Sequence, residues 1–178
     1  PRVKRSDAVK NGHFSKVVLT IYEKYPAELF LYFSKQKHMV DKFCKNVNNV
    51  FVIELLFKFI DSLASHAWLV EEKLMLKLVG LLSEEHDEET IENAVRTMEI
   101  VCNICAFCPF SVLVSQILES EEFTEKLLAF MIKEGDDRDF RIEQGLGIVI
   151  QVLNLLHKDS YSFTEYDFLE SENGESGE

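Results

Sequence analysis

Glycine and proline are scarce in this chain, which has seven glycines and three prolines among its 178 residues. Strand-rich folds need many such turn residues, so the scarcity argues against a β-sheet protein and favours long helices with short joints. Two of the three prolines, Pro26 and Pro109, stand where a helix can begin, because the first residue of a helix does not need its N–H group.

Basic residues are also few, because 19 Lys and Arg against 31 Asp and Glu leave a net charge of −12. Binding to phosphates takes clustered Lys and Arg, so we expect neither nucleic acid nor an anionic membrane surface as a partner. No apolar run approaches the ~18 residues that a membrane-spanning helix needs. The best candidate, residues 50–60, is interrupted by Glu54 and Lys58.

The chain has only four cysteines, and residues 1–10 are polar and basic rather than a secretory signal, so we expect reduced, intracellular thiols. Cys102, Cys105 and Cys108 have the C-x-x-C spacing that zinc and iron–sulfur sites use. Cys102 and Cys105, however, fall within an apolar helical pattern, and no fourth cysteine lies nearby. Buried core thiols are therefore favoured over a metal or redox site, and no cofactor is expected.

Catalytic signatures are missing as well. The sequence has no GxSxG, Walker-type, kinase or HExxH motif. His86 lies in the acidic segment 83–89, where a solvated link is favoured over a weak metal site. Gly145 and Gly147 lack the third glycine and the preceding strand of a dinucleotide fingerprint. The sequence gives no positive case for an enzyme.

Amphipathic helices are what the chain does have, since 47% of its residues are hydrophobic and these recur at three- and four-residue steps. Nine helical segments are predicted, at residues 13–24, 26–35, 38–45, 49–61, 68–82, 88–107, 109–118, 121–133 and 140–157. Several pair at roughly 35 to 45 residues per unit, the pitch of armadillo and HEAT repeats. We predict an all-α, armadillo/HEAT-like α-solenoid of about nine helices, with a compact orthogonal bundle as the alternative.

The domain boundaries follow from composition. Residues 1–12 are predicted to be a basic flexible arm, residues 13–157 the helical-repeat domain, and residues 158–178 an acidic disordered tail. The residues expected on the buried face of the first helix are Phe14, Val17, Val18 and Ile21. Asn46, Asn48 and Asn49 can cap the helix that follows them, and Ser120 is a second predicted cap.

Residues 68–82, WLVEEKLMLKLVGLL, are predicted to form one wide-faced core helix after a short joint at 63–67. Trp68 stands at the entrance of this helix, where its ring can pack across a helix junction. Gly145 and Gly147 lie inside the last predicted helix, where each costs ~1 kcal/mol relative to alanine. Close approach between helices is the expected reason for tolerating them.

Several segments in order resemble the SAPS-domain family, the regulatory subunits of protein phosphatase 6 and their fungal counterparts. WLVEEKL, from Trp68 to Leu74, differs only at Val70 from the family pattern W-L-N-E-E-K-L. HDEETIENAVRTMEIV follows with Asn93, Ala94 and Met98 in step with the family pattern N-A-x-x-x-L. Similar segments precede and follow these two, so the resemblance covers about residues 14–156.

The resemblance implies a non-catalytic helical-repeat scaffold that binds a PP2A-like serine/threonine phosphatase catalytic subunit of the phosphatase 6 type and directs it to substrates. It further implies action in the cytoplasm and sometimes the nucleus, often with an ankyrin-repeat third subunit. The polar residues around the shared motifs, Glu71, Glu72, Lys73 and Asn93, are the candidate partner contacts. Core packing is the alternative for Trp68, and a hydrogen bond at a helix cap or joint is the alternative for Asn93.

A second function remains open at this stage. A general armadillo/HEAT adaptor would bind a peptide or a trafficking partner, and it would use an exposed apolar or asparagine-lined groove along one face.

Overall fold

The computed structural model describes the backbone of residues 16–172 except 84, 107–112, 114–116 and 118, and the side chains of this part except those of 63 and 156–172. All regular elements in the described part are helices, so the predicted all-α fold is confirmed. After a helical stretch over residues 16–24, the helices are α2 (Pro26–Ser34), α3 (Met39–Lys45), α4 (Val50–Ile60), α5 (Leu63–Glu71), α6 (Leu74–Val79), α7 (Glu88–Cys105), α9 (Glu121–Ile132) and α10 (Arg138–Glu172).

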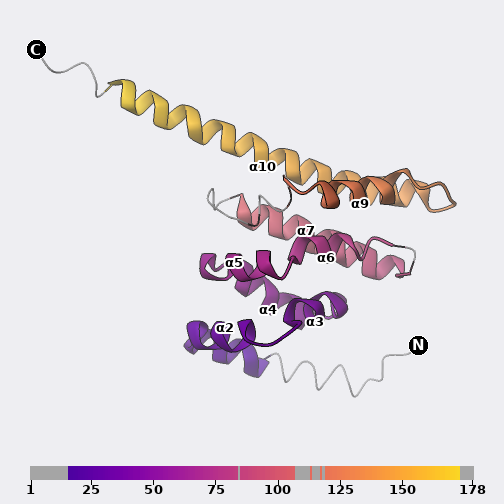
Figure 1. Cartoon of the computed structure of the whole chain (residues 1–178), viewed down its shortest axis with the longest axis horizontal. Helices are drawn as coiled ribbons and strands as arrows, with labels where there is room; N and C mark the ends of the chain where they lie inside the picture. Colours follow the sequence, from indigo (N-terminus) through magenta and orange to yellow (C-terminus); the bar gives the residue numbers. More distant parts are fainter. Residues whose placement is uncertain (1–15, 84, 107–112, 114–116, 118, 173–178) are drawn as a thin grey trace, which may run out of the picture.

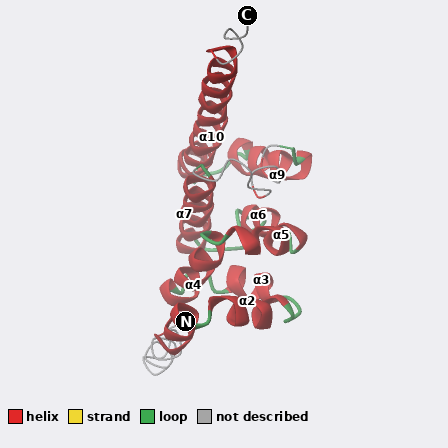
Figure 2. Cartoon of the chain, turned by 90° about the vertical axis from the view of Figure 1, so that its left-hand side faces the viewer, coloured by secondary structure: helices red, strands yellow, loops and turns green. Residues whose placement is uncertain are grey.

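The helices stack in chain order, from α2 at one end to α10 at the other (Figure 1). Figure 2 shows two columns, with α4, α7 and α10 in one and α2, α3, α5, α6 and α9 in the other. Within the columns α10 packs on α7 and α6 packs on α9, and across the columns α10 packs on α9 and α6 packs on α7. Each unit therefore adds one helix to the first column and shorter helices to the second, which is the arrangement of an α-solenoid rather than of an orthogonal bundle.

An internal repeat is visible in the backbone of the second column. His38 (φ 57°) precedes α3, and Lys73 (φ 56°) precedes α6, and both have the left-handed conformation that is rare outside glycine. Both breaks are followed by buried residues at the second, fifth and sixth positions: Val40, Phe43 and Cys44 in one unit, and Met75, Leu78 and Val79 in the next. Leu74, at the first position of the second unit, is buried as well. The sequence showed no strict repeat, because the matching positions hold residues of different size.

The prediction of one helix over residues 68–82 is wrong. The chain ends α5 at Glu71 and begins α6 at Leu74, with Glu72 and Lys73 forming the turn between them. A single apolar stripe passes through both helices, so the spacing of apolar residues did not reveal the break. The family-like segment WLVEEKL is therefore the end of one helix and the turn into the next.

Residues 63–67, predicted as a joint, belong to α5 instead. Ser65 and His66 are polar, as is typical of a joint between helices, yet both are buried. The hydroxyl of Ser65 donates to the carbonyl of Phe59, and His66 Nε2 lies 2.6 Å from the carbonyl oxygen of Ile60. These side chains thus bond to carbonyls in the last turn of α4, where the Phe59 carbonyl also accepts from the N–H of Ser62 at 3.1 Å.

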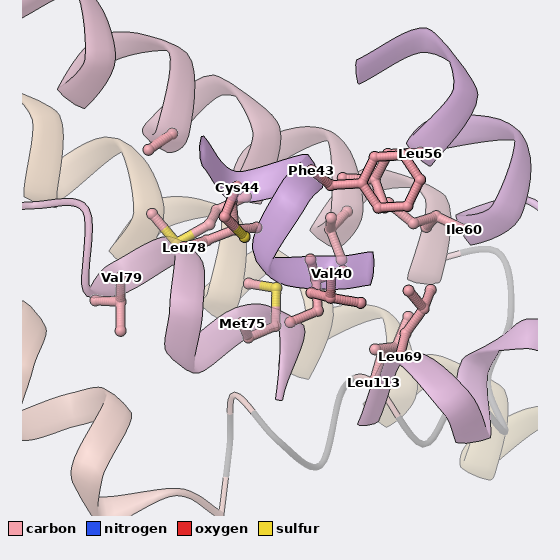
Figure 3. Packing of buried hydrophobic residues seen from close by; sticks show 14 of the residues in the cluster. Val40, Phe43, Cys44, Leu56, Ile60, Leu69, Met75, Leu78, Val79 and Leu113 are labelled. Carbon is pink, nitrogen blue, oxygen red and sulfur yellow. The ribbon is translucent and has the colours of Figure 1, made fainter. Parts of the chain in front are cut away.

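Aromatic rings fill the core between the first two units. Trp68 is buried, and its ring lies 5.8 Å from that of Phe30 and 6.0 Å from that of Phe59, in edge-to-face arrangements. Core packing is therefore the confirmed role of Trp68. Figure 3 shows how buried side chains from α3, α4, α5 and α6 converge beside this cluster.

The first helix is less buried than its pattern predicts. Val18 points into the core, whereas Val17 is 59% exposed and Ile21 is 40% exposed. The prediction of burial is therefore wrong for Val17 and Ile21, and Phe14 lies outside the described residues. This helix lies at the end of the stack, where the described chain offers a neighbour on one side only (Figure 1).

Two predicted caps are confirmed. The side chain of Asn49 accepts a hydrogen bond from the N–H of Phe51 at 3.1 Å, and Ser120 Oγ accepts one from the N–H of Phe123 at 3.1 Å. Each side chain satisfies one of the first-turn donors of its helix.

Gly145 of α10 allows close packing, as expected, because an ideal Cβ there would lie 2.2 Å from Met131 Cγ of α9. At Gly147 an ideal Cβ would lie 2.7 Å from Glu99 Oε1 of α7, which is the movable end of a flexible side chain. Close approach therefore accounts for Gly145 but not for Gly147.

The last helix runs past its predicted end. It was expected to stop near His157 before a disordered tail, but α10 continues to Glu172 and its later part projects beyond the stack (Figure 1). The predicted end of the helix near His157 is thus wrong, because a helix that has already formed can add further residues one at a time. Neither α10 nor any other helix in the described part is long and apolar enough to cross a membrane. The predicted arm over residues 1–12 lies outside the described residues.

Candidate functional site

The turn between α5 and α6 holds three of the four residues predicted to contact a partner. Glu71 is the exposed last residue of α5, Glu72 is half-buried at its C-cap, and Lys73 is exposed with the left-handed backbone noted above. The turn sits mid-stack in the column of shorter helices (Figure 2).

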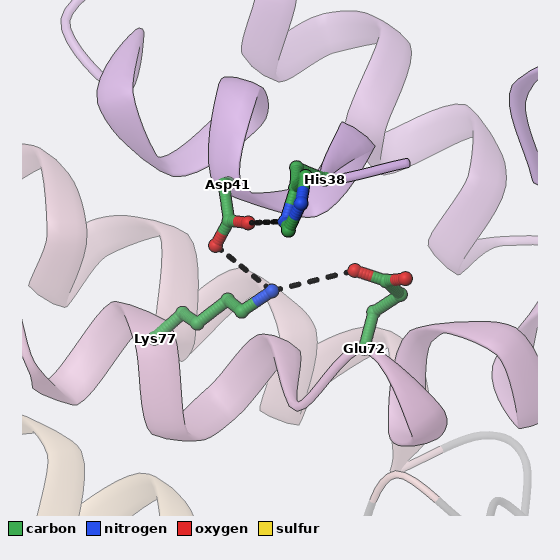
Figure 4. A network of polar contacts seen from close by, with 4 residues as sticks. All are labelled: His38, Asp41, Glu72 and Lys77. Atoms are coloured by element: carbon green, nitrogen blue, oxygen red, sulfur yellow. Dashed lines mark hydrogen bonds and ion pairs between the residues drawn. The ribbon is translucent and has the colours of Figure 1, made fainter. Parts of the chain in front are cut away.

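An ion-pair network fixes this turn against the preceding unit (Figure 4). Lys77 Nζ of α6 lies 3.4 Å from Glu72 Oε2 and 2.9 Å from Asp41 Oδ1 of α3. The second oxygen of Asp41 lies 3.0 Å from His38 Nδ1. The network therefore begins at one left-handed residue, His38, and ends beside the other, Lys73.

The charges in the network shift one another's pKa. The hydrogen bond from Lys77 lowers the pKa of the Asp41 carboxyl below its usual value. Burial disfavours the charged form of Lys77, but Asp41 and Glu72 together outweigh it and raise the pKa of this ammonium group. Asp41 and Lys77 are consequently charged at neutral pH, and Glu72 is already engaged within the fold by its contact with Lys77.

The positive charge of Lys73 acts on the start of α9, in the next unit along the stack. The pKa of Glu122, in the first turn of α9, is lowered mainly by its hydrogen bond with Lys126 and to a smaller degree by the charge of Lys73. Glu71 and Lys73 are thus the two exposed charges of the turn, one negative and one positive.

Asn93, the fourth predicted residue, lies elsewhere. It is half-buried on α7, and its amide donates to Asn48 Oδ1 at 3.1 Å, while the amide of Asn48 donates to Thr90 Oγ1 at 2.9 Å. The chain of hydrogen bonds ties the start of α7 to the joint between α3 and α4. The structural alternative for Asn93, a hydrogen bond at a helix joint, is confirmed.

The cysteines pack as predicted. Cys102 and Cys105 are buried on α7, and Cys44 is buried on α3. Burial raises the pKa of both Cys44 and Cys102 to about 12, which disfavours the thiolate form that metals bind. Within the described residues no group of three His, Cys, Asp or Glu side chains is placed to hold a metal ion. Cys108 lies outside those residues.

A cavity of about 540 Å³ was missed by the sequence analysis. It opens where the end of α6, the start of α7, the second half of α9 and the start of α10 meet. The one signal for it is Arg141, a charged residue four positions before Gly145 on the buried face of α10. A second cavity of about 220 Å³ includes Asn46 and Asn49 in its lining, but both amides already bond to nearby backbone groups.

Comparison with known families identifies the chain. The family model described as SAPS, SIT4 phosphatase-associated protein, matches residues 20–176, a range that contains every helix from α2 to α10. Searches of curated proteins and of solved structures gave no significant match. The family is a phosphatase-associated regulatory domain, in agreement with the resemblance seen in the WLVEEKL and HDEETIENAVRTMEIV segments. The chain therefore belongs to the SAPS family of SIT4 phosphatase-associated proteins.

Proposed function

We propose that this protein is a non-catalytic regulatory subunit, which binds a PP2A-like catalytic subunit of the phosphatase 6 type and directs it to substrates. The single observation that carries the proposal is the family match over most of the chain. An ankyrin-repeat protein is the proposed third subunit, and the cytoplasm, and sometimes the nucleus, is the proposed site of action.

The turn at residues 71–73 is the proposed contact with the catalytic subunit. Its support is geometric, because Glu71 and Lys73 present opposite charges on a turn that Glu72, Lys77 and Asp41 hold in place. A turn that is already ordered loses little conformational entropy when a partner binds. Electrostatic contacts of this kind also favour one partner over others.

Retention of a phosphatase 6 type catalytic subunit on the immobilised chain tests the function. We expect binding at micromolar concentration or below, and no hydrolysis of p-nitrophenyl phosphate by the chain alone. Failure of the intact chain to retain the catalytic subunit would overturn the proposed function.

A double variant tests the contact separately. Glu71→Gln with Lys73→Gln removes both exposed charges but leaves the ion pairs of Lys77 intact, and we expect the dissociation constant to rise about tenfold. Glu23→Gln with Lys24→Gln is the matched control, because both residues are exposed on the first helix. Equal affinity of the two double variants would place the contact elsewhere without removing the function.

A further inference from the structure

The charges of this chain are divided unevenly along the stack. Residues 1–60 hold 11 Lys and Arg and 5 Asp and Glu, whereas residues 61–178 hold 8 Lys and Arg and 26 Asp and Glu. The first part therefore has a net charge of +6, and the second part has a net charge of −18. Because the helices stack in chain order, one end of the stack is basic and the other is acidic (Figure 1). Opposite charges of this kind favour contact between the two ends of different copies.

The basic end carries the 220 Å³ cavity. Apolar side chains of the first helix, α2, α3 and α4 form most of its walls: Val18, Phe33, Phe43, Phe51, Val52 and Leu55. A cavity of ~150 Å³ with apolar walls takes up benzene, so this cavity has room for one aromatic side chain. Its lining also includes the exposed residues Lys42 and Asn46, so the cavity opens to solvent.

The lysines beside this cavity have no acidic partner. Among the described residues that line it, Lys42 is the only charged one. Lys42 and Lys45, in the last turn of α3, are exposed, and neither forms an ion pair with another described residue. Asp41 is already held by Lys77 and His38, and α4, which begins at the cavity, has no acid in its first turn. In the part of the chain that the structure describes, the rim of this cavity is therefore positive.

The acidic end carries a segment of complementary composition. Residues 159–172, DSYSFTEYDFLESE, hold five acids, no Lys or Arg, and five large apolar residues: Tyr161, Phe163, Tyr166, Phe168 and Leu169. This segment is the last part of α10, which projects beyond the stack (Figures 1 and 2). Positions 165, 168 and 172 recur at helical spacing, so Phe168 shares one face of α10 with Glu165 and Glu172. An aromatic residue between two acids suits an apolar cavity with a lysine at its rim.

The cavity and this segment lie too far apart to meet within one chain. The cavity belongs to the first unit, and α10 lies at the opposite end of the stack (Figure 1). The projecting part of α10 points away from the first unit in the second view as well (Figure 2). A contact between them therefore requires two copies of the chain.

We infer that residues 159–172 of one copy bind the 220 Å³ cavity of a second copy. The ring of Phe168 enters the cavity, and Glu165 and Glu172 lie near Lys42 at its rim. Because the contact joins different surfaces, each pair keeps one free cavity and one free segment, and association continues into open chains. The inference does not rest on the proposed phosphatase contact, which uses the separate turn at residues 71–73.

Sedimentation velocity of the full chain tests the association. We measure it at concentrations up to about 1 mM, the range of weak association, and expect the average mass to rise past that of a dimer. A salt concentration of about 0.5 M should lower the average mass, because salt screens contacts between exposed charges. A chain that stays monomeric at the highest concentration would overturn the inference.

Two variants test the two sides of the contact. Lys42→Glu reverses the charge at the cavity, and Phe168→Ala removes the anchor from the segment, so each should weaken association at least about tenfold. An equimolar mixture of the two variants should form a 1:1 dimer and no longer chains, because the intact segment of the first binds the intact cavity of the second. Lys58→Glu is the matched control, because this exposed lysine of α4 does not line the cavity, and its association should equal that of the unchanged chain.

A peptide locates the contact on the chain. The probe is the acetylated and amidated peptide of residues 159–172, and the target is the uniformly ¹⁵N-labelled Phe168→Ala chain, whose cavity is intact. In an NMR titration we expect the peptide to shift amide signals within residues 39–55. A peptide of the same composition in scrambled order is the control, and we expect it to bind about tenfold more weakly.

Several results would contradict the inference. Unchanged association of either Lys42→Glu or Phe168→Ala, or a mixture of the two that stays monomeric, would remove the contact between the two ends. Equal binding of the scrambled peptide would reduce the contact to attraction between charges. Binding of the peptide by a chain that never associates would assign the cavity to an acidic segment of another protein. Thermal unfolding of each variant distinguishes lost association from lost folding.

Discussion

Asp41 of α3 and Lys77 of α6 meet at 2.9 Å across the boundary between the first two units of the stack. Asp41 lies three positions after His38, and Lys77 lies four positions after Lys73; both His38 and Lys73 have the left-handed backbone conformation. The breaks that shorten the helices of the second column thus also place opposite charges where adjacent units touch. The same geometry orders the turn that we propose as the phosphatase contact.

The first prediction concerns the backbone at Lys73. A left-handed conformation costs a non-glycine residue ~1–2 kcal/mol, whereas glycine adopts it freely but gains entropy in the unfolded chain. Lys73→Gly should therefore raise the free energy of unfolding by about 0.5–1 kcal/mol. Urea unfolding followed by circular dichroism measures the change.

Lys58→Gly is the control for that experiment, because this exposed lysine lies within α4. Glycine in a helix interior costs ~1 kcal/mol, so the control should be less stable than the unchanged chain. If Lys73→Gly is destabilised to the same degree, the left-handed turn is not the conformation of the protein in solution.

The second prediction uses the two glycines of α10 as a matched pair. At Gly145 an added methyl group meets Met131 Cγ at 2.2 Å, near the root of that side chain, so Gly145→Ala should destabilise the fold by about 1–3 kcal/mol. At Gly147 the added methyl group meets only the carboxylate end of Glu99, which can turn away. Gly147→Ala should therefore stabilise the fold by up to ~1 kcal/mol, because alanine has the higher helix propensity. Opposite shifts in melting temperature would verify the packing of α10 on α9. Equal shifts of one sign would contradict it.

Some local features of the fold could be predicted from the sequence and others could not. The caps at Asn49 and Ser120 were predictable because a capping side chain acts on a backbone N–H two or three residues away. The break at Lys73 was not, since lysine has no preference for a left-handed backbone and only contacts with the neighbouring unit fix it there. Val17 and Ile21 follow a helical pattern equally well whether or not a neighbour covers them, so their exposure depends on their place at the end of the stack.

The candidate site was predictable only in part. The WLVEEKL segment pointed to the family and to Glu71, Glu72 and Lys73, but its conformation came from the structure. The network around Lys77 joins residues of two units that are far apart in the chain, and no local pattern encodes such a pair. The cavity beside Arg141 likewise depends on how four helices meet, which the order of helices along the chain does not determine.

The third prediction concerns pH. Because Lys77 lowers the pKa of Asp41 in the folded chain, the charged carboxyl stabilises the fold at any pH above its unfolded value of ~3.9, and this contribution is lost as the pH falls through the lower folded value. Asp41→Asn should therefore cost about 0.2–1 kcal/mol at pH 7, as partly exposed ion pairs do. The difference from the unchanged chain should begin to shrink below about pH 4 and should disappear only once the pH is below the lowered pKa of Asp41 in the folded chain. Glu23→Gln, on the exposed first helix, is the control, and a pH-independent effect of Asp41→Asn would contradict the ion pair.

The fourth prediction concerns the buried thiols. The experiment uses a Cys108→Ser background, which leaves Cys44, Cys102 and Cys105. Burial raises the pKa of both Cys44 and Cys102 to about 12. Only a thiolate attacks a disulfide reagent, and at pH 8 a thiol with this pKa is ionised in roughly one molecule in ten thousand. Ellman's reagent should therefore react with the folded chain about a thousandfold more slowly than with the chain in urea, where an ordinary thiol pKa returns. Cys105 is 2% exposed and should be protected by burial alone. Rapid labelling of the folded chain would mean that α3 or α7 opens readily, and protection that appears only after zinc is added would instead make Cys102 and Cys105 metal ligands.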